Sequence, residues 1–133
     1  MTAKELLQKA VEARRQSYSP YSHYQVGACL LCADGTLYSG CNIENAAFGP
    51  TVCAERTAIF KAVSEGKRSF SAIAIVGGPE DSDETQLNSA YPCGVCRQVM
   101  AEFCSPEFHI YCGTPEQPEE FTLAELLPKS FGL

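Results

Sequence analysis

Three thiols and one carboxyl group stand in two short stretches of this chain, in a pattern that could bind and use a metal ion. The first stretch is Cys53-Ala54-Glu55, and the second is Pro92-Cys93-Gly94-Val95-Cys96. Three thiolates can hold a zinc ion and leave its fourth position open for water. A carboxylate two residues from one ligand can lie beside the metal without binding it, as a general acid/base acting on that water must. The pattern therefore predicts a hydrolytic zinc site.

Cys-x-x-Cys spacing alone does not identify a metal site, because the chain repeats it elsewhere. Cys29-Leu30-Leu31-Cys32 lies in a predicted strand, where residues three apart point to opposite faces and cannot bind one ion. We interpret these two cysteines as small core residues. Cys93 and Cys96 differ, because the proline before them and the glycine between them predict a helix start, with both thiols on one face. Taken alone, this pair could still be two buried cysteines or a thioredoxin-like redox pair.

The position of Cys53 in its helix decides whether Glu55 can share the site. Inside a helix, residues i and i+2 lie about 200° apart, but in the first turn, with Cys53 in cap geometry, both can face one point. Both cysteine motifs then lie at predicted helix N-termini, where the helix dipole favours thiolates. We predict Cys53, Cys93 and Cys96 as zinc ligands and Glu55 as the general acid/base. The alternative for Glu55 is a first-turn acid that only complements the dipole.

A cation is expected beside this site. Three thiolates on zinc leave a net negative centre, which makes bound water harder to deprotonate. Arg56 follows the first motif, and we predict that it hydrogen-bonds a ligand thiolate; Arg97 is a second candidate. A solvent-exposed helix arginine is the alternative for Arg56. His23 and His109 are interpreted as polar loop or strand residues, and neither is assigned to the metal.

The elements that position these residues follow from periodicity and turn signals. The predicted helices run from the Thr2–Glu5 capping box to about Gln16, from Cys53 to Gly66, from the second motif through Val95, Val99 and Phe103, and from the Thr122–Glu125 capping box. The predicted strands are Tyr24–Cys32, Thr36–Ile43, Ala72–Val76, Phe108–Cys112 and an edge strand at Phe121. Gly77–Ala90 is predicted as one long polar loop. This alternation predicts an α/β fold in which helices sandwich a mixed sheet.

Length and composition restrict the class of protein. A chain of 133 residues has room for one domain, over 1–133, with a single core. Its net charge of −6 argues against a nucleic-acid partner, and we interpret Arg14-Arg15 as a charge pair at a helix C-terminus. The longest apolar run, Val26–Ala33, is too short to span a bilayer, and no signal-peptide pattern is present. We therefore expect a cytoplasmic protein without a membrane partner, whose eight cysteines are reduced or metal-bound.

Cys-Ala-Glu followed by Pro-Cys-Gly-x-Cys-Arg-Gln resembles the zinc signature of the cytidine deaminases, in its three-cysteine variant. Further stretches resemble the small homotetrameric members of that family: Pro20-Tyr21-Ser22, Val26-Gly27-Ala28, Gly40 to Ala46, Cys53 to Ala58, Lys61 to Gly66 and Glu125 to Pro128. The resemblance covers nearly the whole chain. It implies a three-layer α/β/α sandwich with a five-stranded mixed sheet. It also implies one zinc per subunit and hydrolysis of cytidine and 2′-deoxycytidine to the uridines and ammonia, in pyrimidine salvage.

The resemblance implies how the substrate, a small nucleoside, is bound. Asn42 and Glu44 would hold the ribose 3′-hydroxyl, and Tyr24 would line the pyrimidine pocket. Backbone N–H groups near Cys53 and Ala54 would bind the edge of the base. The alternatives are capping of a turn for Asn42 and Glu44 and an ordinary strand aromatic for Tyr24.

The resemblance also implies a mechanism and an assembly. Glu55 would take a proton from zinc-bound water, which attacks C4 of cytosine, and would protonate N3 and then the departing amino group. In the homotetramer, Ala46, Phe48 and Phe131 would complete a neighbouring subunit's pocket. Core or interface packing is the alternative for these three residues.

Several departures from the family pattern bear on the pocket. Tyr24 and Phe48 exchange the commoner Phe and Tyr, Val95 replaces a usual Ala, and Tyr91 stands where Ser is common. The Gly77–Ala90 stretch is longer than the pattern. None of these changes removes a predicted ligand or Glu55.

Three other functions remain open. The first is deamination of cytosine in DNA or RNA, which the acidic charge disfavours. The second is deamination of another small molecule, such as a cytosine-bearing antibiotic. The third is a structural zinc or redox module without catalysis. A closed structural zinc site would require a fourth protein ligand and would have no use for an acid/base at Glu55.

Overall fold

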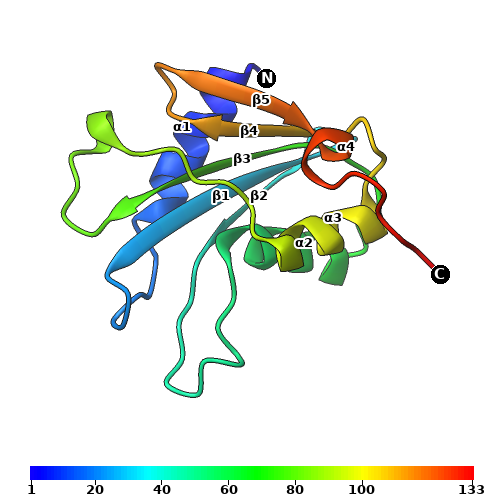
Figure 1. Cartoon of the computed structure of the whole chain (residues 1–133). Helices are drawn as coiled ribbons and strands as arrows, with labels where there is room; N and C mark the ends of the chain where they lie inside the picture. The colour runs from blue at the N-terminus through cyan, green and yellow to red at the C-terminus, as the bar shows by residue number, and fades with distance from the viewer.

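The computed structural model describes residues 1–133 as one five-stranded sheet with helices on both faces (Figure 1). The elements are α1 (Ala3–Arg14), β1 (Tyr24–Cys32), β2 (Leu37–Cys41), α2 (Ala54–Ser64), β3 (Phe70–Pro79), the short 3-10 helix η1 (Glu84–Gln86), α3 (Gly94–Phe103), β4 (His109–Gly113), β5 (Pro118–Thr122) and α4 (Leu123–Leu126). The strand order is β2-β1-β3-β4-β5, with β3 and β4 parallel and the other pairs antiparallel. The predicted α/β/α sandwich with a mixed five-stranded sheet is confirmed. No helix is long and apolar enough to cross a membrane.

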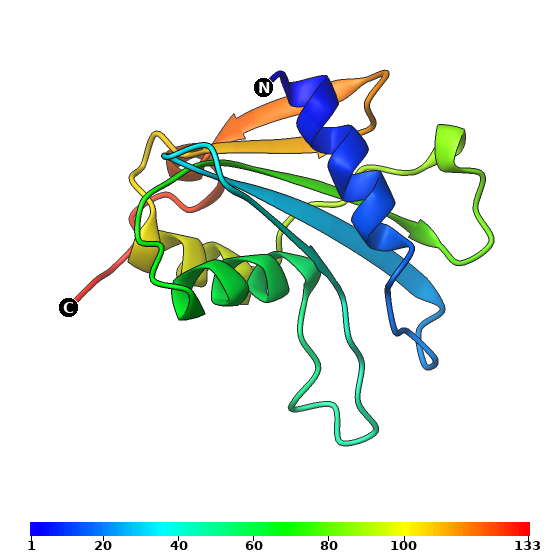
Figure 2. The ribbon, with the colours of Figure 1, turned by 180° about the vertical axis from the view of Figure 1, so that it is seen from behind.

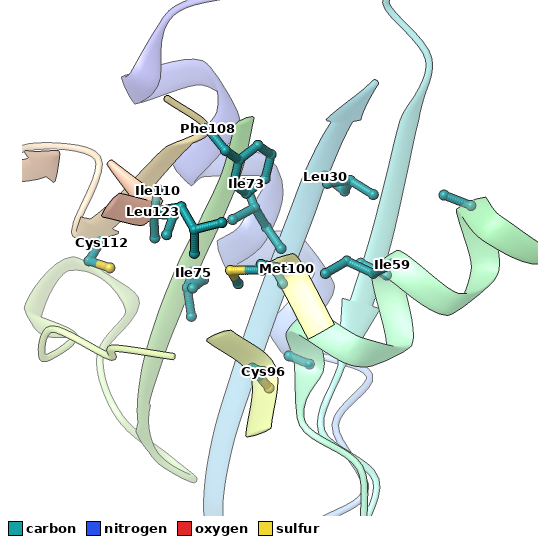
Figure 3. Close-up of a cluster of buried hydrophobic side chains, with 14 of the residues drawn as sticks. Leu30, Ile59, Ile73, Ile75, Cys96, Met100, Phe108, Ile110, Cys112 and Leu123 are labelled. Carbon is teal, nitrogen blue, oxygen red and sulfur yellow. The ribbon is translucent and has the colours of Figure 1, made fainter. Parts of the chain in front are cut away.

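The sheet separates two clusters of buried side chains. On one face, α1 covers β3 with residues such as Leu7 and Val11, and Figure 2 shows this helix lying across the sheet. On the other face, α2 and α3 cover the larger cluster, where Met100 lies between Ile75 of β3 and Ile59 of α2 (Figure 3). Cys29 belongs to the first cluster and Cys32 to the second. The prediction that these two cysteines point to opposite faces is confirmed.

Side-chain caps define where two of the helices begin. Thr2 accepts a hydrogen bond from the Glu5 N–H, and the Glu5 side chain accepts one from the Thr2 N–H. Thr122 and Glu125 form the same reciprocal pair at α4. Each cap satisfies N–H groups that the first turn leaves without a partner. Both predicted capping boxes are confirmed.

Gly40 lets α2 rest directly on the sheet. A Cβ at Gly40 of β2 would lie 2.5 Å from the carbonyl oxygen of Ala54 and 2.6 Å from the backbone nitrogen of Ala58. Only a residue without a side chain fits such a close approach of backbones. The contact fixes the first turn of α2, which carries Cys53 and Glu55, against β2.

The predicted loop over Gly77–Ala90 was wrong at its start. β3 continues to Pro79, because Gly78 and Pro79 pair with Gln25 and Tyr24 at the beginning of β1. This pairing with a neighbouring strand overrides the local turn signals of glycine and proline. Beyond it, η1 forms one short turn, and Leu87 packs into the α1 cluster. The stretch is therefore anchored to the sheet.

The interpretation of Arg14-Arg15 as a pair of helix-terminal charges is confirmed in position, since Arg14 ends α1 and Arg15 is its C-cap, but it missed a further role of Arg14. Its side chain is buried, and its guanidinium donates to the carbonyl oxygens of Gln25 (3.0 Å), Gly78 (3.0 Å) and Pro79 (2.6 Å). Arg15 instead pairs at the surface with Glu84 of η1 at 2.8 Å. Arg14 therefore joins the ends of β1 and β3 to α1.

The apolar spacing that predicted α3 marks its buried face only in part. The helix is present, and Val99 and Phe103 are partly buried and pack against the α2–α3 cluster, whereas Val95 is 58% exposed. The fully buried residues of the helix are Cys96 and Met100. Of the second cysteine motif, Cys96 therefore faces the interior, while Cys93 is exposed.

Candidate metal centre and catalytic pocket

The two cysteine motifs lie at the N-termini of α2 and α3. Cys53 is the N-cap of α2 and Cys93 the N-cap of α3, both with extended backbone, as the first-turn geometry predicted. The Cys93 sulfur accepts a hydrogen bond from the Cys96 N–H at 3.5 Å. The dipoles of both helices therefore favour negative charge on these sulfurs.

The thiols of Cys53, Cys93 and Cys96 form one cluster. Their sulfur atoms all lie within 4.8 Å of one another, and those of Cys53 and Cys93 are 3.7 Å apart. Sulfurs bound at about 2.3 Å to a tetrahedral zinc ion lie about 3.8 Å from one another. All eight cysteines are free of disulfides. The donor set and its spacing fit a zinc ion with three protein ligands.

Charge around the cluster favours thiolate at Cys53. Hydrogen bonding from Cys96 lowers its pKa most, burial opposes this, and Arg56 and Cys93 lower it further, to about 5. The Nη2 of Arg56 lies 3.3 Å from the Cys53 sulfur, in the contact that the sequence predicts. Its Nε is buried and has no hydrogen-bond partner. Arg56 thus faces the cluster rather than solvent.

Glu55 is buried beside the cluster, with only 4% of its surface exposed. Burial raises its pKa to about 7, and the neighbouring charge of Cys53 also raises it. A carboxyl group with a pKa near the working pH can both accept and give a proton. Its burial argues against the alternative of a surface acid that only complements the helix dipole.

A cavity of about 370 Å³ opens in front of these residues. The lining includes Cys53, Cys93 and Glu55 and all four predicted substrate-binding residues, Tyr24, Asn42, Glu44 and Ala54. The rest of the lining comes from Val26, Thr51, Val52, Ile75, Ser89, Ala90 and Tyr91. The structure thus brings the predicted metal, acid/base and substrate residues to one hollow.

Asn42 and Glu44 are held by the backbone around the mouth of this cavity. The Asn42 side chain donates to the Tyr24 carbonyl at 2.8 Å and accepts from the Val26 N–H at 2.9 Å. Glu44 accepts hydrogen bonds from the N–H groups of Tyr21 and Ser22 and from the Ser22 hydroxyl. Hydrogen bonding from Ser22 lowers the pKa of Glu44 most. Both side chains therefore have fixed orientations, and Glu44 is ionised at neutral pH.

The predicted cross-subunit residues lie outside this cavity. Ala46 is exposed, and Phe48 and Phe131 are each 70% exposed. Figure 1 shows why: the chain between β2 and α2 projects from the body as a long loop, and the chain end runs away from the sheet. These side chains do not contribute to their own chain's pocket.

Arg97 and the two histidines have other partners. Arg97 donates to the carbonyls of Pro92 and Leu126, both at 2.7 Å, so its candidacy for a thiolate contact was wrong. His23 pairs with Glu80 and His109 with Glu120. Neither histidine belongs to the metal cluster, as predicted.

Seven lining residues had no site role in the sequence predictions, and three of them, Ser89, Ala90 and Tyr91, lie together before the second motif. Ser89 and Ala90 were predicted in a loop, and Tyr91 was noted only as a departure from the family pattern. They reach the pocket because Asn88 bridges to Gly77 of β3, which brings the stretch back onto the sheet. Tyr91 precedes the second motif, and that position was the one available signal. The contacts of Ser89 and Ala90 depend on the sheet and left no local signal.

Comparisons with known proteins identify the family and its relatives. The family model described as the cytidine and deoxycytidylate deaminase zinc-binding region matches residues 1–112. A cytidine deaminase of Sporosarcina psychrophila is 49% identical over 132 residues, covering 98% of this chain and 92% of the relative. One of Halalkalibacterium halodurans is 48% identical over 127 residues, covering 95% and 91%.

Solved structures of cytidine deaminases also superpose on this chain. The crystal structure of a cytidine deaminase from Burkholderia pseudomallei superposes with a TM-score of 0.87 at 40% identity, covering 98% of this chain and 100% of that one. That of Mycobacterium tuberculosis superposes with a TM-score of 0.82 at 36% identity, covering 100% and 99%.

Proposed function

The chain belongs to the family of zinc-binding cytidine and deoxycytidylate deaminases, and on that premise we propose that it hydrolyses cytidine and 2′-deoxycytidine to uridine and 2′-deoxyuridine. Ammonia is the other product, and the reaction serves pyrimidine salvage. The observation that carries this proposal is the buried Glu55 beside a three-thiol cluster, at one wall of a cavity of nucleoside size.

The charge of the cavity favours nucleosides over nucleotides. Its lining holds two carboxyl groups, Glu44 and Glu55, and no lysine or arginine. A phosphate monoester carries a charge of about −1.5 to −2 at pH 7 and would face these carboxylates without a compensating cation. Deoxycytidylate, which the family's description includes, is therefore the disfavoured substrate. The chain's net charge of −6 disfavours polynucleotides in the same way.

Cys53, Cys93 and Cys96 would hold the zinc ion, one per subunit. When bound, zinc supplies the activation of water that hydrolytic deamination requires. Arg56 offsets part of the negative charge of the three thiolates through its contact with Cys53. The remaining chemistry belongs to the protein's own acid/base.

Glu55 moves the protons of the reaction. Its carboxylate takes a proton from the attacking water, whose oxygen bonds to C4 of the cytosine ring. Glu55 delivers this proton to N3. It then takes the proton of the new C4 hydroxyl and gives it to the amino group, so that the C4–N bond breaks, the C4 carbonyl forms and ammonia leaves. A pKa raised to about 7 suits both directions of transfer near neutral pH.

Four further residues bind and orient the nucleoside in this proposal. The ionised Glu44, with Asn42, accepts the hydrogen bond of the ribose 3′-hydroxyl, while Tyr24 packs against the pyrimidine. Backbone groups at Ala54 contact the edge of the base. Fixed orientations reduce the entropy lost on binding, because the side chains are already held by their neighbours.

We further propose that residues 1–133 form a single catalytic domain that assembles, in the cytoplasm, into a homotetramer with shared active sites. The exposure of Phe48 and Phe131, with the exposed Ala46 on the same loop as Phe48, supports this assembly, because large apolar side chains exposed on projecting segments mark interaction sites. Light scattering should give a mass of about 58 kDa, four times 14.4 kDa. A monomer mass would contradict the shared sites.

A panel of substrates tests the function. Loss of cytosine absorbance is followed with cytidine, 2′-deoxycytidine, cytidine 5′-monophosphate and a cytosine-containing oligonucleotide, using zinc-loaded protein. We expect both nucleosides to turn over, with kcat/KM at least about 100-fold above that of the nucleotide. Absence of nucleoside turnover, or faster turnover of the nucleotide or oligonucleotide, would contradict the proposal.

A further inference from the structure

One carboxylate on β5 holds the stretch of chain that leads into the second cysteine motif. Glu119 accepts a hydrogen bond from the Ser89 hydroxyl at 2.5 Å. It also accepts from the Tyr91 hydroxyl, whose oxygen lies 3.0 Å from Oε1 and 3.1 Å from Oε2. Tyr91 and Ser89 lie 28 and 30 residues before Glu119 in the sequence, and both donate to its carboxylate.

The residues that Glu119 holds form a wall of the catalytic cavity. Ser89, Ala90 and Tyr91 all line it, together with Glu55 of α2. They lie outside the helices and strands, so no ladder of backbone hydrogen bonds holds them in place. Their side-chain hydrogen bonds both end on Glu119. Without that carboxylate, the wall would depend on packing and on the Asn88–Gly77 bridge that precedes it.

Apolar contacts place Ala90 and the Tyr91 ring of this wall, whereas the hydroxyl groups of Ser89 and Tyr91 are held by Glu119. Ala90 sits over Gly77 of β3, where an added Cβ would come within 2.9 Å of the Ala90 Cβ. The Tyr91 ring meets the Phe121 ring edge to face at 5.9 Å. Tyr91 is nevertheless 50% exposed, so its ring can turn away if the hydroxyl loses its acceptor.

We propose that Glu119 is a positioning residue for the deamination, which holds the 89–91 wall against the bound nucleoside through Ser89 and Tyr91. The proposal rests on the function proposed above. Glu119 does not line the cavity itself and acts only through these two partners. The wall contacts the substrate before and during the reaction alike, so its loss weakens ground state and transition state equally. Such a loss raises KM and leaves kcat nearly unchanged.

The test compares five variants by cytidine kinetics. Glu119→Ala removes the acceptor, Tyr91→Phe removes one donor but keeps the ring, and Ser89→Ala removes the other. Glu119→Gln keeps one acceptor oxygen. Glu120→Ala is the matched control, because Glu120 is the next residue of β5, is exposed, and pairs with His109 rather than with the wall.

Glu119→Ala removes the acceptor of both Ser89 and Tyr91, but only part of that loss reaches the substrate through the wall. We therefore expect it to lower kcat/KM about tenfold, through KM. Glu119→Gln should recover most of this loss, and Tyr91→Phe should lose less than Glu119→Ala. Combining Tyr91→Phe with Glu119→Ala should add nothing, because both remove the same contact. Glu120→Ala should match the wild type. Kinetics of Glu119→Ala within about twofold of wild type, or a loss confined to kcat, would overturn the proposal.

Hydrogen exchange gives a readout that needs no turnover. In Glu119→Ala, backbone amides of 88–91 should exchange faster than in wild type, while those of α1 stay unchanged. Unchanged exchange at 88–91 would overturn the role of Glu119. If wild-type protein fails to deaminate cytidine, the proposed function falls, whereas the exchange result still decides whether Glu119 holds the wall.

Discussion

Replacing Arg14 by methionine tests whether one buried guanidinium joins the strand ends beside the catalytic cavity. Arg14 is 3% exposed and donates three hydrogen bonds, to the carbonyls of Gln25, Gly78 and Pro79. Methionine keeps the apolar stem and removes every donor. A hydrogen bond to a charged group contributes about 1.5–3 kcal/mol. The buried Gly78 carbonyl would lose this donor, whereas the Pro79 carbonyl would keep its hydrogen bonds from Ser82. Since relaxation recovers part of this, we expect the free energy of unfolding to fall by about 4 kcal/mol.

Arg15→Met is the matched control for this prediction. Arg15 is the next residue, and its pair with Glu84 is exposed, so its removal should change stability little. Urea unfolding followed by circular dichroism at one pH gives both values. A loss below about 1 kcal/mol for Arg14→Met, or a loss equal to that of Arg15→Met, would refute the account of Arg14 as a structural tie.

Two further predictions concern other parts of the structure. Gly40→Ala should lower the free energy of unfolding by about 1–3 kcal/mol and lower the affinity for zinc, because the added Cβ would meet the Ala54 carbonyl at 2.5 Å and push α2 away. Urea unfolding measures the first effect and chelator titration the second. An unchanged zinc affinity would contradict this prediction. Burial raises the pKa of Cys112 to about 12 from 9.0, so its contribution to stability is complete below pH 9 and is lost as the pH rises toward 12. By pH 11 this loss should reach about 3 kcal/mol, and Cys112→Ala should flatten the fall in unfolding free energy between pH 9 and pH 11; an equally steep fall in the variant would contradict the cause.

Local signals in the sequence were sufficient to predict most of the helices and strands. The capping residues Thr2 and Thr122 marked two helix starts because the hydrogen bonds that they make lie within four residues. β1 was predicted with its exact bounds, since nine consecutive residues suited a strand covered on both faces. The metal cluster was predictable for a similar reason, because both cysteine motifs stand at helix N-termini.

Features that depend on distant partners were not predictable. The continuation of β3 through Gly78 requires β1 beside it, and the burial of Arg14 requires the carbonyls of both strands. Glu119 approaches Tyr91 only because β5 pairs with β4 at the sheet edge. The face of α3 was evident only in part, since Val99 and Phe103 pack against the core but Val95, which continues the same apolar pattern, is exposed. In each case the contact joins elements that are distant in the sequence, so the local pattern either gives no sign of it or points to a different structure.

The most direct test of the central claim compares cytidine deamination by wild-type protein and Glu55→Gln, each with its zinc content measured at one per chain. Loss of absorbance gives the rates, and the amide keeps the volume of the buried side chain while removing its titratable proton. Glu55→Ala at the same zinc content gives a second variant. We predict that both variants retain zinc and lose about 10²–10⁴ of kcat. A zinc-loaded Glu55→Gln that deaminates cytidine within about tenfold of wild type would contradict the assignment of Glu55 as the acid/base.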